Sequence, residues 1–227
     1  PDKYGDRTFK CPECGKKMLL RQDSKFSSHG LWYACPDFPR CRGAHSSHPN
    51  GEPMGTPADQ ETKNARMAAH KTFDQLWEPD KKKRAEAYRF LAGALKIPFE
   101  ECHIGSFTKE QCEHTAHVCE LRLELDKIQV ECNEEGWDGY DGQPITKEMV
   151  GVASRFLMAL PYPSPIKPTV VPAGDGSIGF EWYITQGRLL RLDVNLQGQL
   201  DYAAFLGVSN CVSGAVQFVD VVPPVVC

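Results

Sequence analysis

The sequence lacks any long apolar run. Nowhere in its 227 residues do about 18 apolar residues follow one another, which is the length that a helix needs to cross a bilayer. The opening residues, PDKYGDRTFK, also lack the apolar segment of a secretory signal. We therefore expect a cytoplasmic protein without a membrane partner.

Cysteine is too scarce for a disulfide-stabilised scaffold. The ten cysteines make up about 4% of the chain, whereas such scaffolds reach roughly 8 to 10%. The cysteines are unevenly spread: four fall within residues 11–41, four within 102–132, and Cys211 and Cys227 stand apart. In a reducing compartment, such short spacings favour metal binding over disulfides.

Recognisable catalytic motifs are missing as well. The sequence has no phosphate-binding loop, no HExxH motif, and no serine or cysteine nucleophile beside a placed base. Asp138, Asp141 and Asp175 lie in glycine-rich stretches, where carboxylates could bind a cation or act in catalysis. Aspartate and glycine are also the residues that turns require, so we favour a turn role and do not expect an enzyme.

The sequence does contain enough apolar material for a core, at 41% of its residues, and its charge is unevenly distributed. Residues 1–51 hold nine Lys or Arg and five Asp or Glu, which gives a net charge of +4. Residues 128–227 hold five and eleven, which gives −6. The basic end points to nucleic acid and the acidic end to a different partner.

The N-terminal half divides into a finger and helices. Residues 9–48 are rich in Cys, His, Gly and Pro without a helical period, so we expect a zinc-ribbon-like finger. Helices should follow over residues 58–77, 84–96 and 108–125. Thr56 is placed to cap the first helix, and Met67 belongs to its inner stripe. Thr108 and Gln111 have the spacing of a capping box at the third.

The pattern changes after residue 128. Residues 145–160 have the apolar period of an amphipathic helix. Alternating apolar residues then predict antiparallel strands joined by tight turns, at residues 177–185, 189–197 and 199–207, with a fourth at 215–222. In the first three strands the apolar residues occupy even-numbered positions, Ile184 and Leu206 among them, so we expect this face to pack on the preceding helix.

Together these patterns predict an α+β protein, with an N-terminal zinc-ribbon-like finger and a three-helix segment followed by a helix packed on an antiparallel β-meander. We place the finger at residues 1–52, the helical segment at 53–127 and the α+β domain at 128–227. The oligomeric state is left open.

The first cysteine cluster has the spacing of a metal site. Cys11 and Cys14 form a CPEC knuckle, and Cys35 and Cys41 form a second pair after a gap of twenty residues. Four thiolates suit one structural Zn²⁺ in a closed tetrahedron. Gly15 lets the backbone turn its N–H groups toward the sulfurs.

Two alternatives remain open for this cluster. The cysteines could be buried or bridged in pairs, or His45 or His48 could replace Cys41 as the fourth ligand. In every metal-bound version, four protein ligands leave no open coordination position, so the ion holds no reactive water. Any function of the finger would then lie on its surface.

That surface combines cationic and aromatic side chains, which follow phosphates and stack on unpaired bases, respectively. We predict that single-stranded DNA or RNA contacts Lys16, Lys17, Arg21, Trp32, Tyr33, Phe38, Arg40 and Arg42. Alternatively, at least two of the aromatic residues form the small core of the finger.

The motifs CPECGKKMLLRQ and WYACPDFPRC resemble those of a known type of zinc finger. They combine a CPxCG knuckle, a following Met-x-x-Arg, and a second knuckle of the form aromatic-x-x-C-x-x-x-P-x-C. This combination is similar to the four-cysteine zinc fingers at the C-termini of bacterial type I DNA topoisomerases. The resemblance implies that Cys11, Cys14, Cys35 and Cys41 hold zinc and that the finger contacts single-stranded DNA.

A wider resemblance covers residues 9–120 and includes GEPMGT, AHKTFDQLW, RAEAYRFLAGALKIP and CHIGSF. These stretches are similar to a family of bacterial and phage proteins described as zinc-finger-containing domains, which has no established activity. The C-terminal half, with GWDGYDGQPIT and PAGDGSIGFEW, resembles small uncharacterised bacterial domains, some of them near toxin–antitoxin or mobile genes.

The second cysteine cluster allows two interpretations. A further metal site could use Cys102, His103, Cys112, His114, His117 and Cys119. On a helix, however, Cys112 and Cys119 share a stripe that leaves out both neighbouring histidines. Because cysteine is often a small buried hydrophobe, we favour a core role.

Two functional hypotheses follow. The first is a zinc-binding accessory protein that binds nucleic acid through the basic, aromatic face of its finger. The second is a protein-interaction adaptor, in a phage or toxin–antitoxin context, in which zinc is purely structural and the acidic C-terminal domain binds a protein partner.

Overall fold

The computed structural model describes residues 9–25, 27–163, 166–207 and 210–222. They form two compact units, the first up to Lys71 together with His103–Glu113, and the second from Thr72–Cys102 together with the chain from His114 onward. The predicted division at residues 52 and 127 stays a prediction. In the part of the chain that is described, no helix has the length and apolar character needed to span a bilayer.

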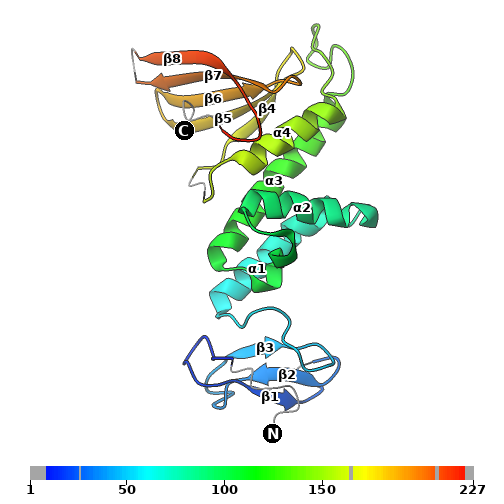
Figure 1. Ribbon diagram of the computed structural model, residues 1–227, viewed down its shortest axis with the longest axis vertical. Helices are drawn as coiled ribbons and strands as arrows, with labels where there is room; N and C mark the ends of the chain where they lie inside the picture. Colours follow the sequence, from blue (N-terminus) through cyan, green and yellow to red (C-terminus); the bar gives the residue numbers. More distant parts are fainter. Residues whose placement is uncertain (1–8, 26, 164–165, 208–209, 223–227) are drawn as a thin grey trace. The chain divides into compact units, whose positions relative to one another are not determined.

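The first unit contains the finger, a three-stranded antiparallel sheet in the order β1-β2-β3 (Figure 1). Its strands are β1 (Leu19–Gln22), β2 (Leu31–Ala34) and β3 (Ala44–Ser46). In the register, Arg21 lies opposite Trp32, and Tyr33 lies between Leu20 and His45. Because successive side chains of a strand point to opposite faces, Trp32 and Tyr33 project to different sides of the sheet.

The first unit also contains most of helix α1 (Gln60–Phe73) and the start of α3 (Lys109–Glu131). The prediction that Thr56 caps α1 is wrong. The carboxylate of Asp59 accepts a hydrogen bond from the N–H of Thr62 at 2.8 Å, while the N–H of Thr56 donates to the carbonyl of Gly105. Asp59 therefore satisfies one of the free N–H groups of the first turn.

The predicted capping box of α3 is confirmed. The Thr108 N–H donates to Oε1 of Gln111 at 2.9 Å, and the Gln111 N–H donates to Oγ1 of Thr108 at 3.2 Å. This reciprocal pair fixes the start of the helix. It also fixes the end of the returning segment, residues 103–108, which belongs to the first unit.

Arg66 holds the first unit together. Its Nε and Nη2 donate to the carbonyl of Phe107 at 2.9 and 2.8 Å, and its Nη1 donates to the carbonyl of Thr56. Three donors of one guanidinium thus join α1 to the segment before it and to the returning segment.

The second unit holds the remaining helices. Helix α2 (Arg84–Leu95) packs on α4 (Lys147–Ala159), with Gly93 so near Met158 that a β-carbon would lie 2.7 Å from its Sδ. All the predicted helices are therefore present. Short 3-10 helices occupy Asp74–Leu76, Lys81–Lys83, Phe99–Glu101 and Ile104–Ser106, the last of these in the first unit.

The predicted meander is confirmed as a five-stranded antiparallel sheet in the order β4-β5-β6-β7-β8 (Figure 1). Its strands are β4 (Thr169–Pro172), β5 (Ile178–Thr185), β6 (Arg188–Val194), β7 (Gln199–Leu206) and β8 (Cys211–Gln217). Strand β4 was not predicted. Strand β8 begins earlier than expected and ends before Phe218, whose side chain is buried.

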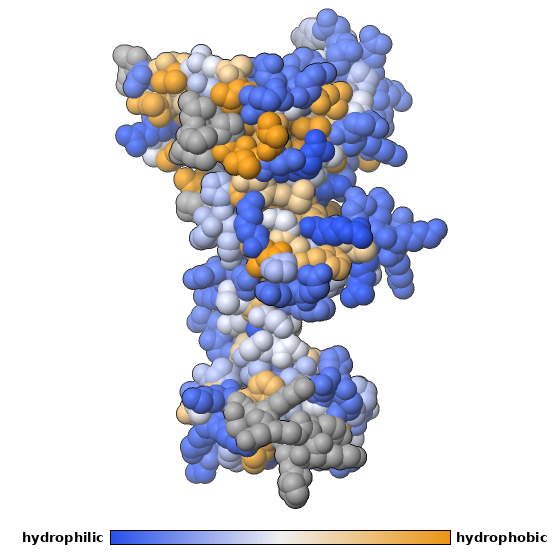
Figure 2. All heavy atoms as spheres, viewed as in Figure 1, coloured by the Kyte–Doolittle hydropathy of each residue, from blue (hydrophilic) through white to orange (hydrophobic). Residues whose placement is uncertain are grey.

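One end of the sheet is covered and the other is open. At the covered end, Phe156 of α4 lies 4.8 Å from Phe180 and 5.6 Å from Phe218, between ring centroids. The even-numbered face packs on the preceding helix as predicted, but only at this end, because Ile184 and Leu206 remain 53% and 55% exposed. Figure 2 shows apolar residues gathered over this sheet.

We call the exposed apolar residues at the uncovered end the open end, which comprises Tyr183, Ile184, Phe205, Leu206 and Val212. A single helix, about 10 to 12 Å across with its side chains, covers only part of the length of strands of 8 residues such as β5 and β7, which run for about 26 Å. Helices and antiparallel sheets in separate segments make this an α+β protein, as predicted.

Candidate metal centre and finger surface

Four thiols meet at one point of the finger. The Sγ of Cys14 lies 3.5 Å from that of Cys35 and 3.6 Å from that of Cys41, and the Cys11 and Cys41 sulfurs are also 3.6 Å apart. All four sulfurs lie within 4.8 Å of one another. The two cysteine pairs, separated by strands β1 and β2, are thus brought together by the finger.

These distances fit zinc and exclude disulfides. A tetrahedral zinc ion with bonds of about 2.3 Å places its sulfurs about 3.8 Å apart, whereas a disulfide is about 2.05 Å long. The four cysteines are free thiols, so the bridged alternative is wrong. Cys41 itself occupies the fourth corner, so neither His45 nor His48 is needed to complete the set.

Backbone N–H groups support the sulfurs. The N–H groups of Lys16, Asp37 and Gly43 hydrogen-bond to the thiols of Cys14, Cys35 and Cys41, respectively. Gly15 has a φ of +75°, in the left-handed region that favours glycine. Its N–H donates to the carbonyl of Cys11, and the turn directs the Lys16 N–H at the sulfur, as predicted.

The thiols differ in how easily they ionise. The N–H of Lys16 lowers the pKa of Cys14, whereas burial raises the pKa of Cys35. Four thiolates this close repel one another, so they require a cation between them. A divalent zinc ion supplies that charge and deprotonates its ligands.

Gly43 leaves room for the site. A β-carbon at this position would lie 2.2 Å from Sγ of Cys11 and 3.6 Å from the β-carbon of Cys35. The carbonyl of Gly43 also accepts the Cys35 N–H at 2.8 Å. The glycine is therefore part of the wall around the four sulfurs.

Comparison with protein families gives a match over residues 7–121, about half of the chain, to a family described as a zinc-finger-containing domain. The chain belongs to this family. No curated protein and no solved structure matches it. Together with the geometry of the cysteines, the family supports one structural zinc ion, held by Cys11, Cys14, Cys35 and Cys41.

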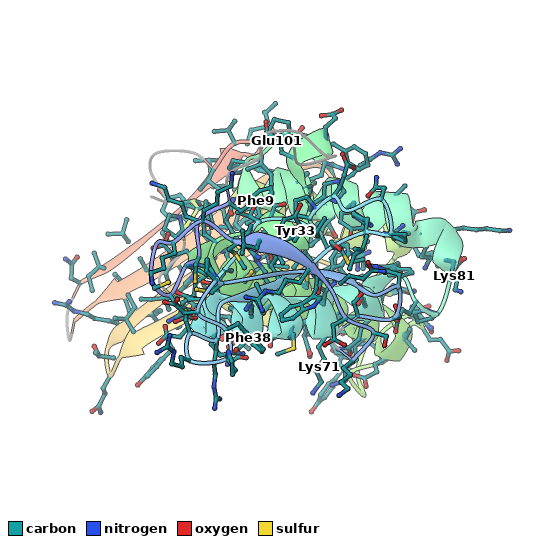
Figure 3. The ribbon with its side chains drawn as sticks, turned by 90° about the horizontal axis from the view of Figure 1, so that it is seen from below. Phe9, Tyr33, Phe38, Lys71, Lys81 and Glu101 are labelled. Atoms are coloured by element: carbon teal, nitrogen blue, oxygen red, sulfur yellow. The ribbon has the colours of Figure 1, made fainter. Side chains whose placement is uncertain are left out.

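Two of the three aromatic residues predicted to contact nucleic acid are buried. Tyr33 packs with Phe9, whose ring centroid lies 5.4 Å away, and donates from its hydroxyl to the carbonyl of Gly51 at 2.8 Å. Trp32 is also buried and lies edge-to-face with Phe38 at 5.1 Å, which leaves Phe38 half-buried. Figure 3 shows Phe9 and Tyr33 next to one another and Phe38 apart from them.

The predicted cationic residues also differ in their surroundings. Lys16 forms an ion pair with Asp37 at 2.5 Å, and Arg21 donates to the carbonyls of Cys35 and Pro36, so both brace the second knuckle. The side chain of Lys17 is exposed, and the backbone of Lys17 pairs with that of Lys10 in an isolated antiparallel β-bridge. Arg40 and Arg42 are exposed on the second knuckle itself.

A groove of about 530 Å³ lies beside the second knuckle, within the first unit. We call it the finger groove; its lining residues are Trp32, Phe38, Ala44, His45, Ser46, Met54, Lys63, Arg66, Met67 and Gly105. Lys63 reaches across it to donate to the carbonyl of Ala44 at 2.7 Å. Its lining is mostly apolar, with two cations.

The finger groove was not predicted, since the helical spacing alone puts Met67 on the inner stripe of α1. Met67 is in fact 63% exposed. The spacing of Lys63, Arg66 and Met67, at i, i+3 and i+4, places them on one face of the helix. That spacing was a usable signal, but only the fold shows that this face looks onto the finger.

His45 adds a polar group to the groove. Burial lowers its pKa to about 4, so the ring is neutral near pH 7. Its Nε2 is buried and has no hydrogen-bond partner among the described residues. A neutral imidazole offers one donor and one acceptor, so this nitrogen is an unpaired polar atom in the wall of the groove.

The second cysteine cluster has the buried thiols expected of a core. Cys102, Cys112 and Cys119 are each at most 2% exposed, and burial raises the pKa of Cys102 and of Cys112 to about 11. His114 stacks edge-on against Tyr162 at 4.5 Å. Among the described residues, the first cluster is the one group of Cys, His, Asp or Glu with metal-binding geometry.

The glycine-rich loops use their aspartates in turns. Oδ1 of Asp138 accepts the N–H groups of Tyr140 and Gly142, at 2.9 and 3.1 Å. Oδ1 of Asp175 accepts both the N–H and the hydroxyl of Ser177. Both carboxylates therefore support the local turn that was favoured from the sequence. Asp141 is exposed, and Cys227 lies outside the described residues.

Proposed function

We propose that the first unit binds single-stranded nucleic acid, with unpaired bases in the finger groove and the phosphate backbone along the cationic residues beside it. The observation that carries this proposal is the composition of the groove, in which apolar and aromatic walls are combined with Lys63 and Arg66. Proteins that bind single strands combine stacking surfaces with cations in this way.

The apolar wall of the finger groove can pack against an unpaired base. Phe38 is half-buried with Trp32 packed against its edge, so its ring is held in place. Met54 and Met67 are 40% and 63% exposed on the same groove, and a thioether makes favourable contacts with aromatic rings.

The cationic side chains are placed to contact the phosphate backbone of the nucleic acid. Lys63 and Arg66 donate to carbonyl oxygens, which satisfy hydrogen bonds without neutralising the charge. Arg40 and Arg42 are exposed on the adjoining second knuckle. Lys16 of the predicted set is left out, since its charge is paired with Asp37, whereas Arg21, like Lys63 and Arg66, donates only to carbonyl oxygens and keeps its charge.

The test is fluorescence anisotropy of the zinc-loaded full chain with labelled single-stranded DNA, single-stranded RNA and a duplex, over a range of salt concentrations. We expect single strands to bind more tightly than the duplex. Replacing both Arg40 and Arg42 with alanine should lower the slope of log affinity against log salt by about 2, since each phosphate contact contributes about 1.

The matched control replaces Lys81 and Lys82 with alanine. These exposed lysines of the second unit give the same change in net charge. If the control lowers the salt slope as much as the arginine variant, binding is a general charge effect. If no strand binds at low salt, the proposal is wrong.

A second candidate is a protein-interaction adaptor, in which the second unit binds a protein and zinc only stabilises the finger. It is favoured by the open end of the sheet, where Tyr183, Phe205 and Leu206 are 67%, 45% and 55% exposed. Exposed apolar patches are typical of interaction sites. Replacing Tyr183 and Leu206 with serine should abolish recovery of a protein partner if this candidate is correct.

We also propose a cytoplasmic location. It is supported by the nine cysteines of the described part of the chain, all of which are free thiols. Free thiols persist in reducing compartments. Location of a tagged chain by fractionation tests this proposal.

A further inference from the structure

We propose that strand β8 is a pairing edge for a second copy of this chain, joined antiparallel around Gly214 so that two five-stranded sheets form one continuous sheet. Strand β8 is the last in the order of the sheet and pairs on one side with β7. Among the described residues no strand pairs with its other side, so the backbone N–H and C=O groups there form a free edge, which is a template for another strand. This inference is independent of nucleic-acid binding.

The β8 edge lacks the features that usually block such pairing. Its sequence, CVSGAVQ, has no charged residue and no proline, and its register with β7 runs without a bulge from one end to the other. Free edges are normally protected by charge, proline, bulges or shortness. The opposite edge, β4, has such protection, because it is four residues long and ends in Pro172.

The β8 sequence complements itself. In an antiparallel pair centred on Gly214, Val212 lies opposite Val216 of the second copy and Ser213 lies opposite Ala215. All seven residues are paired, and no like charges meet. Pairs of β-branched side chains on one face are the units that stabilise a sheet.

The neighbouring side chains extend this interface. Val212 is 45% exposed and aligns with Ala204 in the register, next to Leu206 on the same face. On the other face, Phe205 is 45% exposed and aligns with Cys211. A strand joined at β8 would lie directly beside Val212 and shield part of it, while Phe205 and Leu206 lie one strand further from the joint.

The expected complex is weak. Stable dimers bury at least about 1,200 Å² of surface, and a single pair of seven-residue strands with its adjacent side chains is a small interface by that standard. We therefore expect an equilibrium between monomer and dimer that shifts with concentration. Sedimentation velocity of the full chain over about a hundredfold range of concentration measures it.

The first variant replaces Ser213 and Ala215 with lysine. In the proposed register Lys at 213 faces Lys at 215 of the second copy, so like charges oppose each other twice and the dimer should be lost. Changing Ser213→Glu together with Ala215→Lys places opposite charges at the same positions and should restore it; Lys at 215 also lies opposite Asp201 of β7, so the chain's own sheet is not disturbed. Gly214 is left unchanged, because a β-carbon there would lie 2.6 Å from the hydroxyl of Tyr202 and would disturb the sheet itself.

The control is Thr169→Lys, a charge on the other edge strand, which should leave the dimer intact. The register itself is tested with Gln217→Cys, since residue 217 would face Cys211 of the second copy, and Cys211 is a free, exposed thiol. Mild oxidation should give a 211–217 intermolecular disulfide, identified as a cross-linked peptide by mass spectrometry.

A chain that is monomeric at every concentration overturns the proposal. So does a double-lysine variant that associates as well as the unaltered chain while its circular dichroism shows a folded sheet. Association that survives in that variant would assign the contact to another surface, such as the open end alone or a different partner. Loss of association in both double variants would show that the register centred on Gly214 is wrong.

Discussion

The α-carbon of Gly43 faces the thiol of Cys11 so closely that a β-carbon would lie 2.2 Å from the sulfur. No side chain fits at that distance, so alanine at position 43 would move either the second knuckle or Cys11. The position of one zinc ligand is therefore set by the absence of a side chain across the site.

Gly43→Ala should weaken zinc binding by about 10- to 100-fold, the range found when the surroundings of metal ligands are altered. Competition with a chromogenic chelator measures the change. The control is Gly151→Ala in α4, where a β-carbon meets no atom within 4 Å. That change should leave zinc binding unaltered and stabilise the second unit by about 0.5 to 1 kcal/mol. Equal zinc affinity in all three proteins would contradict the steric role of Gly43.

The full chain should contain one zinc ion, measured by elemental analysis of the purified protein. Cys35→Ser should remove it, because Cys35 supplies one of the four sulfurs and a hydroxyl is a poor replacement for a thiolate. The finger should then lose its fold, since structural zinc contributes folding free energy directly. Cys211→Ser is the control, as this exposed thiol belongs to the second unit and should not affect zinc content. A stoichiometry of two would reinstate a second site.

Asp59→Ala should destabilise the first unit by about 1 kcal/mol, because the Thr62 N–H loses its cap. Asp59→Asn keeps an oxygen that can accept the same hydrogen bond, so it should recover most of the loss. Urea unfolding of the zinc-loaded proteins gives the comparison. Equal destabilisation by alanine and asparagine would show that charge, and not capping, matters at this position.

Stability should fall in acid partly because of His114. Burial, the charge of His117 and the charge of Lys96 lower the pKa of His114 to about 4 in the folded chain, although its bond to the backbone of Ala94 acts in the opposite direction. The unfolded value is about 6.5. Between these values the unfolded state binds more protons, so the free energy of unfolding decreases as pH falls from about 6.5 to about 4.

The measurement is urea unfolding of the unaltered chain and of His114→Gln at about pH 7 and about pH 5. Glutamine does not titrate, so the variant should lose less stability over this interval. Acid also releases zinc by protonating the cysteines, but that effect is common to both proteins and cancels in the comparison. An identical decrease in both would assign the acid sensitivity to other groups.

Local patterns predicted most of the secondary structure. The capping box of Thr108 and Gln111 was found because both partners are close in sequence. The cap of α1 was misplaced because Thr56 and Asp59 both have capping side chains, and only the pairing of Thr56 with Gly105 decides between them. Strand β4 was missed because four residues are too few for an alternating pattern to stand out.

The sequence pattern predicted which face of a sheet a side chain lies on better than it predicted whether that side chain is buried. The alternation in β5 places Ile178, Phe180 and Ile184 on one face; Ile178 and Phe180 are buried there, whereas Ile184 falls at a register shift between Tyr183 and Thr185 and is exposed. Periodicity identifies which residues share a face but not how far the covering helix extends. The same limit applies to the finger, where neighbouring Trp32 and Tyr33 are both buried although they project to opposite sides.

The four zinc ligands were predictable because a thiolate site needs residues of one type at short spacing. The finger groove was not, because its wall combines residues 32–67 with Gly105, and no local pattern joins them. Lys63 and Arg66 look like ordinary solvent-facing helix residues in the sequence. Their role depends on the finger lying against the same face of α1 within the first unit.

The first unit is not a continuous piece of chain. It loses residues 72–102 to the second unit and recovers the chain at His103–Glu113, where the carbonyl of Phe107 receives two donors of Arg66. A recombination that transferred only residues 1–71 would leave that guanidinium without its main acceptor. The family match, which ends at residue 121 inside α3, likewise cuts through a helix. The smallest fragment that keeps Arg66 together with its acceptors is therefore longer than the zinc finger and includes the segment that returns at residues 103–113.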